Sequence, residues 1–442
     1  MMKINNFLNN LIIFFVGIGG ISMSGLAKIA LINGAKVFGS DISINDETIK
    51  LLSQGAHIFD KHDAKNISSD LDLVVYSGAI AKNNPELVQA KKLKIRLMER
   101  SKFLGLISKC YKHVIAISGT HGKTTTTALV SEIFAAAGKN PTIHLGGVSV
   151  NFDDNTIIGG NDYFIVEACE YRESFLQIKP ECGVITNIES DHLDYYKNYK
   201  NIERAFCKFA KGSNTLVTSE NIDHKKLIDV KKTFVSKNII VTQNGYTFDV
   251  YKNNSFYANI ELNIIGRHNI ENVIFAIAVA DIYGIKKEII VKTIKDYRGC
   301  KRRYEIIGSI WDTPIIIDYA HHPTEITNSI CGVSEHYNNI LIVFQPHTYS
   351  RTKMLKNDFA KALAPIDSLI IFKTYSAREN EIAGGSAWDL YNILKNPNLI
   401  YIDDVKKLYS AIHDACYMKM YDCVLILGAG NLAVDFAKLL KN

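Results

Sequence analysis

Long apolar segments are missing from this sequence of 442 residues. No run reaches the roughly 18 to 20 apolar residues that a membrane-spanning helix needs. The apolar stretch at residues 11–16 is short and gives way to Gly17, Gly19 and Gly20, which favours a buried strand entering a glycine turn over a signal peptide. We therefore expect a protein without a membrane partner.

Paired cysteines and basic tracts are missing as well. The eight cysteines are scattered without a CxxC pair, which argues against a zinc cluster or a disulfide scaffold and favours reduced thiols in a cytoplasm. The 51 Lys and Arg residues stand against 45 Asp and Glu, and the net charge of +6 is not gathered into a polybasic run. This balance predicts no nucleic-acid partner and, at most, mild attraction for anionic small molecules. We expect a monomer or a weak homodimer.

The chain is too long for a single hydrophobic core, and short apolar runs alternate with helical patterns along it. This alternation predicts an α/β fold with parallel sheets. A second strand from His113 opens a new glycine loop, and five further apolar runs follow the polar segment RGCKRRY. We place three domains at residues 1–110, 111–298 and 299–442.

The sharpest motif is a strand, a glycine loop and a helix start. Its residues are Gly119, Thr120, His121, Gly122, Lys123, Thr124 and Thr125. Glycines let backbone N–H groups turn toward phosphate oxygens, and the helix N-terminus adds positive potential. Lys123 can neutralise phosphate charge, and the Thr124 hydroxyl can ligate Mg²⁺. The motif predicts nucleoside triphosphate binding, although its glycine spacing is shorter than in the common phosphate loop.

Two further segments place polar groups at the ends of apolar strands. Glu167 follows YFIV, and His192 follows CGVITNI in the segment Ser190-Asp191-His192. The carboxyl ends of parallel strands are where ligands bind, and Mg²⁺ prefers oxygen ligands. Glu170, in the same EACE segment as Glu167, is an alternative ligand.

A weaker signal is the first glycine loop, Gly17-Ile18-Gly19-Gly20-Ile21-Ser22, with Asp41 about two dozen residues on. It is similar to a dinucleotide fingerprint, in which a pyrophosphate sits on a helix N-terminus and an acid holds ribose. Ser22 stands where that fingerprint has its third glycine.

Taken in order, the motifs resemble the Mur (muramyl) ligase family, and within it the member that adds L-alanine. The resemblance covers nearly the whole chain and rests on these segments: FVGIGGISMSGLA, GTHGKTTTT, EACEYRESFL, TNIESDHLDYY, GRHNIENV, DYAHHPTEI, QPHTYSRT and GAGN. It implies a three-domain fold with a Rossmann-like N-terminal domain, a central P-loop ATPase-like domain and a Rossmann-like C-terminal domain. It also implies ATP-driven attachment of L-alanine to UDP-N-acetylmuramate through an acyl phosphate, in peptidoglycan precursor synthesis.

The resemblance implies roles for individual residues. The catalytic set is Lys123, His192 and Arg303, and the metal set for Mg²⁺ is Thr124, Glu167 and His192. For ATP it adds to the phosphate loop His268, Asn269 and Asn272 at the adenine, Asp318 at the ribose and Arg303 at the phosphate. For the UDP-sugar it implies Gly17, Gly19, Gly20, Asp41, Ser77 and Arg100, and for the amino acid Tyr319, His321 and Arg351.

Some features leave alternatives open. The pair His321-His322 also suits a metal site, and Thr348 stands where the family more often has an arginine that binds the alanine carboxylate. A recycling ligase that attaches a ready-made tripeptide to the same sugar nucleotide shares most of these motifs. A nicotinamide-dependent oxidoreductase would use the first glycine loop but give GTHGKT no task. A catalytically silent UDP-sugar-binding regulator is the third alternative. Replacing Lys123 by alanine is expected to abolish turnover and to leave the fold largely intact.

Overall fold

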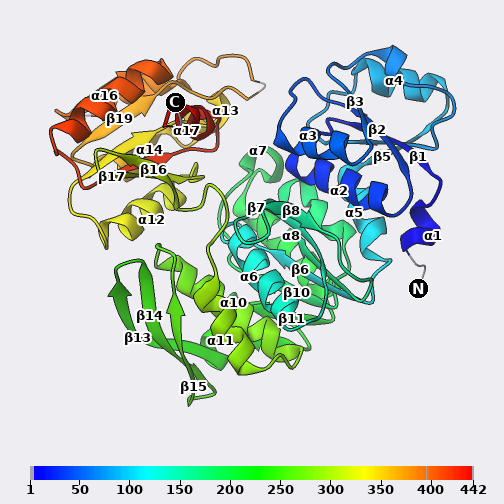
Figure 1. Ribbon diagram of the computed structural model, residues 1–442, viewed down its shortest axis with the longest axis horizontal. Helices are drawn as coiled ribbons and strands as arrows, with labels where there is room; N and C mark the ends of the chain where they lie inside the picture. Colours follow the sequence, from blue (N-terminus) through cyan, green and yellow to red (C-terminus); the bar gives the residue numbers. More distant parts are fainter. Residues whose placement is uncertain (1–3, 378, 395, 441–442) are drawn as a thin grey trace. The chain divides into compact units, whose positions relative to one another are not determined.

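The computed structural model describes residues 4–377, 379–394 and 396–440. The chain divides into two compact units (Figure 1). The first comprises residues 1–237, 249–260 and 272–297, and the second comprises residues 238–248, 261–271 and 298–442. Each unit is built on parallel β-structure, as the alternation of apolar runs predicts.

The first unit begins with a five-stranded parallel sheet in the order β3-β2-β1-β4-β5. Its strands are β1 (Ile12–Val16), β2 (Lys36–Ser40), β3 (His57–Phe59), β4 (Leu73–Tyr76) and β5 (Arg96–Glu99). Its helices are α1 (Ile4–Leu8), α2 (Ile21–Ile32), α3 (Asp46–Ser53), η1 (Ala64–Asn66), α4 (Pro85–Lys92) and α5 (Arg100–Ser108). The strand order reverses between β1 and β4, and the crevice at such a reversal is where ligands bind in open α/β sheets.

The same unit contains a seven-stranded sheet in the order β12-β11-β10-β6-β9-β7-β8, parallel except for the pair β7–β8. Its strands are β6 (His113–Ser118), β7 (Thr142–Ser149), β8 (Asp154–Ile157), β9 (Tyr163–Glu167), β10 (Cys182–Ile185), β11 (Thr215–Thr218) and β12 (Leu227–Asp229). Its helices are α6 (Lys123–Ala136), η2 (Tyr171–Gln177), α7 (Leu193–Tyr196), α8 (Tyr199–Gly212) and α9 (Val230–Thr233). One hydrophobic core cluster, which includes Phe103 and Phe175, contains residues of both the first and the second sheet.

A three-stranded sheet follows, in the order β13-β14-β15, and its residues belong partly to each unit. Its strands are β13 (Phe234–Thr242), β14 (Gly245–Lys252) and β15 (Ser255–Leu262), and the next helices are α10 (His268–Ile282) and α11 (Lys287–Asp296). The polar, β-branched segments at residues 213–265 predict such smaller strands.

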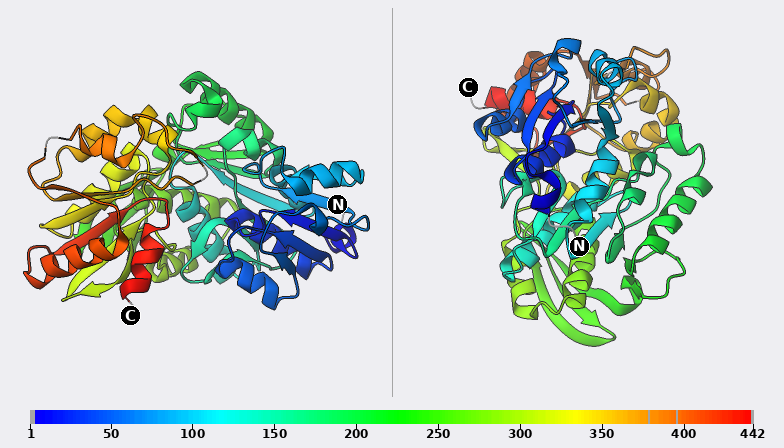
Figure 2. Two further views of the ribbon diagram at one scale, coloured as in Figure 1. Left: turned by 90° about the horizontal axis from the view of Figure 1, so that it is seen from above. Right: turned by 90° about the vertical axis from the view of Figure 1, so that its right-hand side faces the viewer.

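The second unit is built on a six-stranded sheet in the order β16-β17-β21-β18-β19-β20, with only β16 antiparallel to its neighbour. Its strands are β16 (Glu305–Ile310), β17 (Thr313–Asp318), β18 (Ile340–Phe344), β19 (Leu369–Phe372), β20 (Leu399–Ile402) and β21 (Cys423–Leu427). Its helices are α12 (Pro323–Ser334), α13 (Tyr349–Met354), α14 (Lys356–Leu363), α15 (Ala387–Tyr391), α16 (Val405–Tyr417) and α17 (Leu432–Leu440). The C-terminal helix α17 packs beside α16 (Figure 2).

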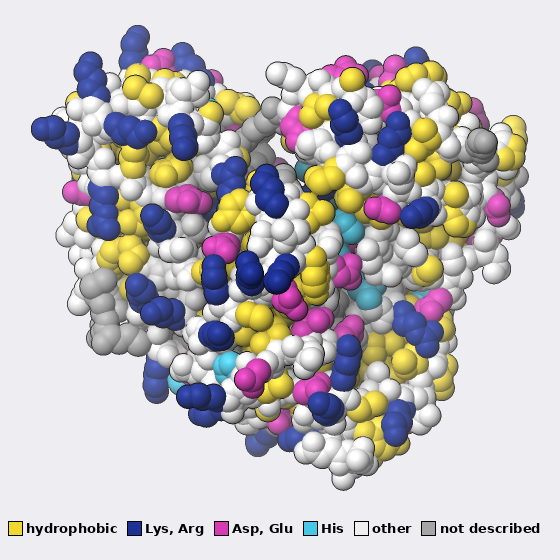
Figure 3. Space-filling model, turned by 180° about the vertical axis from the view of Figure 1, so that it is seen from behind, with side chains coloured by type: hydrophobic (Ala, Val, Ile, Leu, Met, Phe, Trp, Pro, Cys, Tyr) yellow, Lys and Arg dark blue, Asp and Glu magenta, His cyan; other side chains and the backbone are white. Residues whose placement is uncertain are grey.

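Two further observations concern the surface and the helices. On the face drawn in Figure 3, Lys and Arg side chains are interspersed with acidic and hydrophobic ones. Within residues 4–377, 379–394 and 396–440, no helix has both the length and the apolar character needed to cross a membrane.

A buried carboxyl on α6 makes stability depend on pH. Glu132 accepts hydrogen bonds from the Ser149 hydroxyl at 3.2 Å and the Asn151 amide at 2.8 Å. Burial raises the pKa of Glu132 to about 8, although these two hydrogen bonds oppose the shift. The folded protein therefore holds a proton here that the unfolded chain releases near pH 4.5.

We expect Glu132→Gln to stabilise the protein, most strongly at alkaline pH. Between about pH 4.5 and 8 the free energy of unfolding falls as pH rises, because the folded state binds the extra proton. The glutamine amide does not ionise. Its oxygen can accept the hydrogen bond from Asn151, and its NH2 group can donate one to the Ser149 hydroxyl. The thermal midpoint should rise by several degrees at pH 8 and hardly at pH 4.5. Equal gains at both pH values, or the same gain from the exposed control Glu203→Gln, would contradict this account.

Candidate active site

The phosphate loop lies at the carboxyl end of β6, in the middle of the seven-stranded sheet. Gly119 has a φ of +141°, and a Cβ there would lie 1.9 Å from the Thr186 hydroxyl. Gly122 has a φ of +79° at the N-cap of α6, and a Cβ there would lie 2.4 Å from the side-chain oxygen of Asn272. Both positions therefore require glycine. The resulting cradle ends on a helix N-terminus, the geometry that suits a phosphate.

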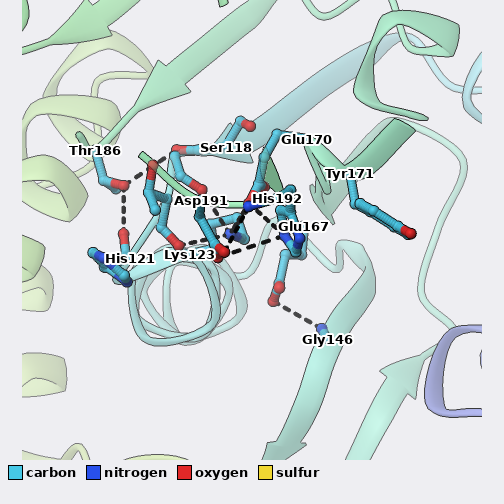
Figure 4. Close-up of polar contacts among 12 residues, drawn as sticks. Ser118, His121, Lys123, Gly146, Glu167, Glu170, Tyr171, Thr186, Asp191 and His192 are labelled. Atoms are coloured by element: carbon cyan, nitrogen blue, oxygen red, sulfur yellow. Dashed lines mark hydrogen bonds and ion pairs between the residues drawn. The ribbon is translucent and has the colours of Figure 1, made fainter. Parts of the chain in front are cut away.

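Lys123 donates hydrogen bonds to the loop that carries it and to Glu170 (Figure 4). Its ammonium donates to the carbonyls of Gly119 at 2.6 Å and Thr120 at 3.0 Å, and lies 3.0 Å from the Glu170 carboxylate. Burial opposes the charge on Lys123, but Glu170, helped by Cys169 and Glu167, outweighs it and raises the pKa of Lys123 above its ordinary value. Burial likewise opposes the charge on Glu170, but Lys123 and His192 lower its pKa. The two groups form a buried ion pair.

Glu167 and Thr124 lie against one pair of glycines on β7. Glu167 ends β9, next to Ile117 of β6, and its Oε2 accepts the Gly146 N–H at 2.8 Å. A Cβ at Gly146 would lie 2.3 Å from Glu167 Oε1, and one at Gly147 would lie 3.2 Å from the Thr124 side chain. The Glu167 carboxylate and the Thr124 methyl group therefore flank the same dipeptide beside the phosphate loop. Carboxylate and hydroxyl oxygens, which these two side chains also carry, are ligands that Mg²⁺ prefers.

His192 lies on the other side of the phosphate loop, beyond the end of β10. Its Nε2 is 3.5 Å from Glu170 Oε1 and 3.6 Å from Asp191 Oδ2, and its ring lies against Tyr171 (Figure 4). The backbone of His192 is left-handed, with a φ of 52°. Glu170, which follows β9, contacts both Lys123 of the loop and His192, which follows β10. It therefore links the segments after the two strands that flank β6.

The residues of the first glycine loop converge at the switch point of the first sheet. A Cβ at Gly17, after β1, would lie 3.7 Å from that of Ser77, after β4. The Gly19 N–H donates to Asp41 Oδ2 at 2.9 Å. Arg100, the first residue of α5, donates to the Ser22 hydroxyl at 3.0 Å. The structure thus brings these predicted sugar-nucleotide residues together with Gly20, which is the N-cap of α2.

The three residues predicted at the adenine lie at the start of α10. Asn269 donates to the Ile265 carbonyl at 2.8 Å, and Asn272 accepts the Thr126 hydroxyl at 3.2 Å. The His268 ring lies 5.6 Å from the Tyr304 ring. Asn272 therefore contacts the phosphate-loop helix directly, whereas His268 and Asn269 belong to the second unit.

In the second unit, the segment around Arg303 lies against the end of β17. Arg302 and Arg303 both face the Tyr319 ring, at 4.7 and 5.3 Å. Asp318 is buried and accepts hydrogen bonds from the Tyr304 and Ala320 amides and the Ser329 hydroxyl. Burial raises the pKa of Asp318, and Arg303 and Ser329 oppose the shift.

Arg351 is held by a histidine that follows β18, which is separated from β17 by β21. Its guanidinium donates to His347 Nδ1 at 3.2 Å, and the His347 ring lies 5.7 Å from that of His321. Burial lowers the pKa of His347 to about 3, with His321 and Arg351 adding to the effect, so this ring is a neutral acceptor. Thr348 caps α13 with a φ of 65°, a strained backbone for a β-branched residue. His321, Arg351 and Tyr319 thus gather at one edge of the sheet.

Several residues at these sites were not predicted from the sequence. They are Arg302, which donates to the Gly428 and Gly430 carbonyls, His347, Thr186, Asn187 and His144. The four-residue spacing of His347 and Arg351 was an available signal, since such residues meet at a helix start. The others act through contacts between distant segments.

Comparison with known proteins decides the family. Models for the Mur ligase family catalytic domain, the Mur ligase middle domain and the Mur ligase glutamate ligase domain match residues 12–112, 117–280 and 302–430. The chain belongs to the Mur ligase family. Its members are ATP-dependent ligases that form amide bonds, and this chain is a three-domain α/β enzyme of that class.

Individual proteins are similar to this chain over nearly its full length. The UDP-N-acetylmuramate–L-alanine ligase of Clostridium acetobutylicum is 42% identical, with 95% of each chain covered. The structure of the UDP-N-acetylmuramate–alanine ligase of Thermotoga maritima matches with a TM-score of 0.84 and 29% identity over 98% of each chain. A murein peptide ligase from Psychrobacter arcticus shares the fold, with a TM-score of 0.73 and 23% identity over 98% of this chain and 99% of that chain.

Proposed function

We propose that this chain joins L-alanine to the carboxylate of UDP-N-acetylmuramate, using ATP, in peptidoglycan precursor synthesis. The observation that carries the proposal is the position of the Lys123 loop between Glu167 and His192. The chain is also 42% identical, over nearly its full length, to a relative named for this reaction. The reaction would take place in the cytoplasm, without nucleic acid or membrane, in a monomer or weak homodimer. It would support cell shape and division.

Carboxylates do not condense with amines in water, so the carboxylate oxygen must first become part of a leaving group. In the proposed first step a carboxylate oxygen bonds to the γ-phosphorus of ATP, the bond to the β,γ-bridging oxygen breaks, and ADP leaves. The alanine amine then attacks the acyl phosphate, and phosphate departs with the original carboxylate oxygen. Phosphoryl transfer of this kind depends on positioning and charge neutralisation.

We assign these tasks to particular residues. Lys123 and Arg303 neutralise phosphate charge, the loop at residues 119–125 binds the phosphates, and Thr124, Glu167 and His192 would hold Mg²⁺. The bound ion would supply positive charge that stabilises the phosphate oxygens. Glu167 is preferred to Glu170 as the ligand because Glu170 is buried against Lys123.

The adenosine and substrate sites complete the assignment. Asn269, Asn272 and His268 would contact the adenine, and Asp318 the ribose. The first glycine loop, with Asp41, Ser77 and Arg100, would bind the UDP-sugar, and Tyr319, His321 and Arg351 the alanine. These tasks correspond to the proposed domains at 1–110, 111–298 and 299–442.

An acceptor assay tests the proposed function. ADP release is measured with ATP, Mg²⁺ and UDP-N-acetylmuramate while the acceptor is L-alanine, glycine, L-serine or the murein tripeptide. We expect release with L-alanine and little with the tripeptide. Preference for the tripeptide would establish the recycling reaction, and release independent of any acceptor would rule out both ligases.

Arg351 is expected to determine the affinity for alanine. A planar guanidinium binds a carboxylate through two hydrogen bonds, and His347 holds it in place. Arg351→Ala should raise the KM for L-alanine by at least about tenfold, the effect of losing a charge-assisted hydrogen bond, and leave the KM for ATP unchanged. The matched control is Lys353→Ala, an exposed cation on the same helix. Unchanged alanine KM in the Arg351 variant would remove this residue from the amino-acid site.

A further inference from the structure

His144, on β7, is buried where the first and second sheets of the first unit meet, and both of its ring nitrogens have partners. Nε2 lies 2.8 Å from the Ser22 hydroxyl, and Nδ1 lies 3.0 Å from the Thr156 hydroxyl. Helix α2 approaches so closely that a Cβ at Gly25 would lie 2.7 Å from the His144 ring. The ring is therefore packed closely against α2 and hydrogen-bonded at both nitrogens.

The Arg100 guanidinium can only donate, and it does so to the Ser22 hydroxyl at 3.0 Å. The Ser22 hydroxyl keeps its own proton, which it can donate to His144 Nε2 when that nitrogen is unprotonated. In this tautomer Nδ1 carries the ring proton and donates it to the Thr156 hydroxyl. Burial, together with the charge of Arg100, lowers the pKa of His144 to about 3, which keeps the ring neutral.

Ser22 thus connects the sugar-nucleotide site to the second sheet. It follows the first glycine loop at the start of α2, where a dinucleotide fingerprint has its third glycine. Arg100 is one of the residues assigned to the UDP-sugar. The chain of contacts Arg100–Ser22–His144–Thr156 fixes the guanidinium with respect to the glycine loop.

We propose that His144 is a positioning residue for the sugar nucleotide: it accepts the Ser22 proton and so turns the Ser22 oxygen toward Arg100, holding the guanidinium for the anionic substrate. The proposal rests on the proposed function, since it takes the ligand of the first glycine loop to be UDP-N-acetylmuramate. His144 itself does not touch the substrate.

The competing explanation is that His144 only stabilises the packing of α2 against β7 and β8, where other contacts are also present. Lys28 lies 2.6 Å from Asp154 and donates to the Thr156 carbonyl at 2.8 Å. Lys28→Met removes these contacts without removing Ser22, Arg100 or His144. It is the matched control for loosened packing between α2 and the β7–β8 pair.

The test compares the KM values of all three substrates. His144→Leu should raise the KM for UDP-N-acetylmuramate about tenfold, the effect of one buried hydrogen bond, with kcat and the KM for ATP little changed. His144→Gln should recover most of the loss, because its amide oxygen can accept from Ser22. Lys28→Met should leave the sugar-nucleotide KM within about twofold of wild type, because Arg100, Ser22 and His144 are unchanged.

A double-mutant cycle protects the test against poor folding of one variant. Ser22→Ala, like His144→Leu, should raise the KM for UDP-N-acetylmuramate. The double variant should have a KM no higher than that of either single variant, because the two residues belong to the same series of hydrogen bonds. Additive effects, equal increases in the ATP and sugar-nucleotide KM values, or an unchanged KM in His144→Leu would overturn the proposal. Direct titration with UDP-N-acetylmuramate distinguishes failure of the proposed function from failure of the positioning role. If the wild-type protein does not bind the sugar nucleotide, the proposed function is wrong. If the wild-type protein and the His144→Leu variant bind it equally well, only the positioning role is wrong.

Discussion

Lys123→Met is expected to reduce turnover by about a thousandfold or more, the scale of removing a cation from a phosphoryl-transfer site. The ammonium lies within the proposed phosphate loop, with 15% of its side chain exposed. ADP release at saturating substrates is the measurement. Turnover within tenfold of wild type would remove Lys123 from the catalytic set.

The same substitution is expected to destabilise the protein, which revises the expectation that a loop lysine contributes little to the fold. Glu170, with 4% of its side chain exposed, would lose the cation that faces it. Removing one member of a buried pair costs about 3–5 kcal/mol. The double variant Lys123→Met/Glu170→Gln should recover most of the thermal midpoint and none of the activity. Recovery of both would show that the lysine serves only the fold.

Glu167→Gln is expected to raise the Mg²⁺ concentration needed for half-maximal activity by at least about tenfold, as for loss of a group that supports a metal. The amide oxygen can still accept the Gly146 N–H, so the local structure is kept while the charge is lost. The measurement is ADP release against Mg²⁺ concentration at fixed ATP.

Two comparators make the Glu167 result specific. Glu203→Gln removes an exposed carboxylate from α8 and should leave the Mg²⁺ dependence unchanged. Glu170→Gln removes the other acid of the EACE segment, and its Mg²⁺ dependence should stay near wild type even where kcat falls. If Glu170→Gln shifts the Mg²⁺ requirement and Glu167→Gln does not, the metal assignment must move to Glu170.

The sequence was most informative where function depends on neighbouring residues. The loop from Gly119 to Thr125 combines its glycines, cation and hydroxyl in one segment, and the strand before it and the helix after it are both present. The same is true of Gly17 to Ser22 with Asp41, because a strand order that reverses at β1 is the usual consequence of βαβ alternation.

The sequence was least informative where function depends on contacts between distant segments. Glu167 and Glu170 are three residues apart, and only the end of β9 shows that the first faces Gly146 while the second turns inward to Lys123. His144 lies 122 residues from Ser22, and no pattern in either segment indicates that they meet. Such pairings are set by sheet order and helix packing, which local propensity does not encode.

Transfer of an isotope from the substrate carboxylate tests the central claim most directly. UDP-N-acetylmuramate labelled with ¹⁸O in its carboxylate is incubated with ATP, Mg²⁺, L-alanine and the protein, and the released phosphate is analysed by mass spectrometry. Activation as an acyl phosphate predicts one labelled oxygen in each phosphate for each amide formed. Amide formation with unlabelled phosphate, or with the label in AMP, would contradict it.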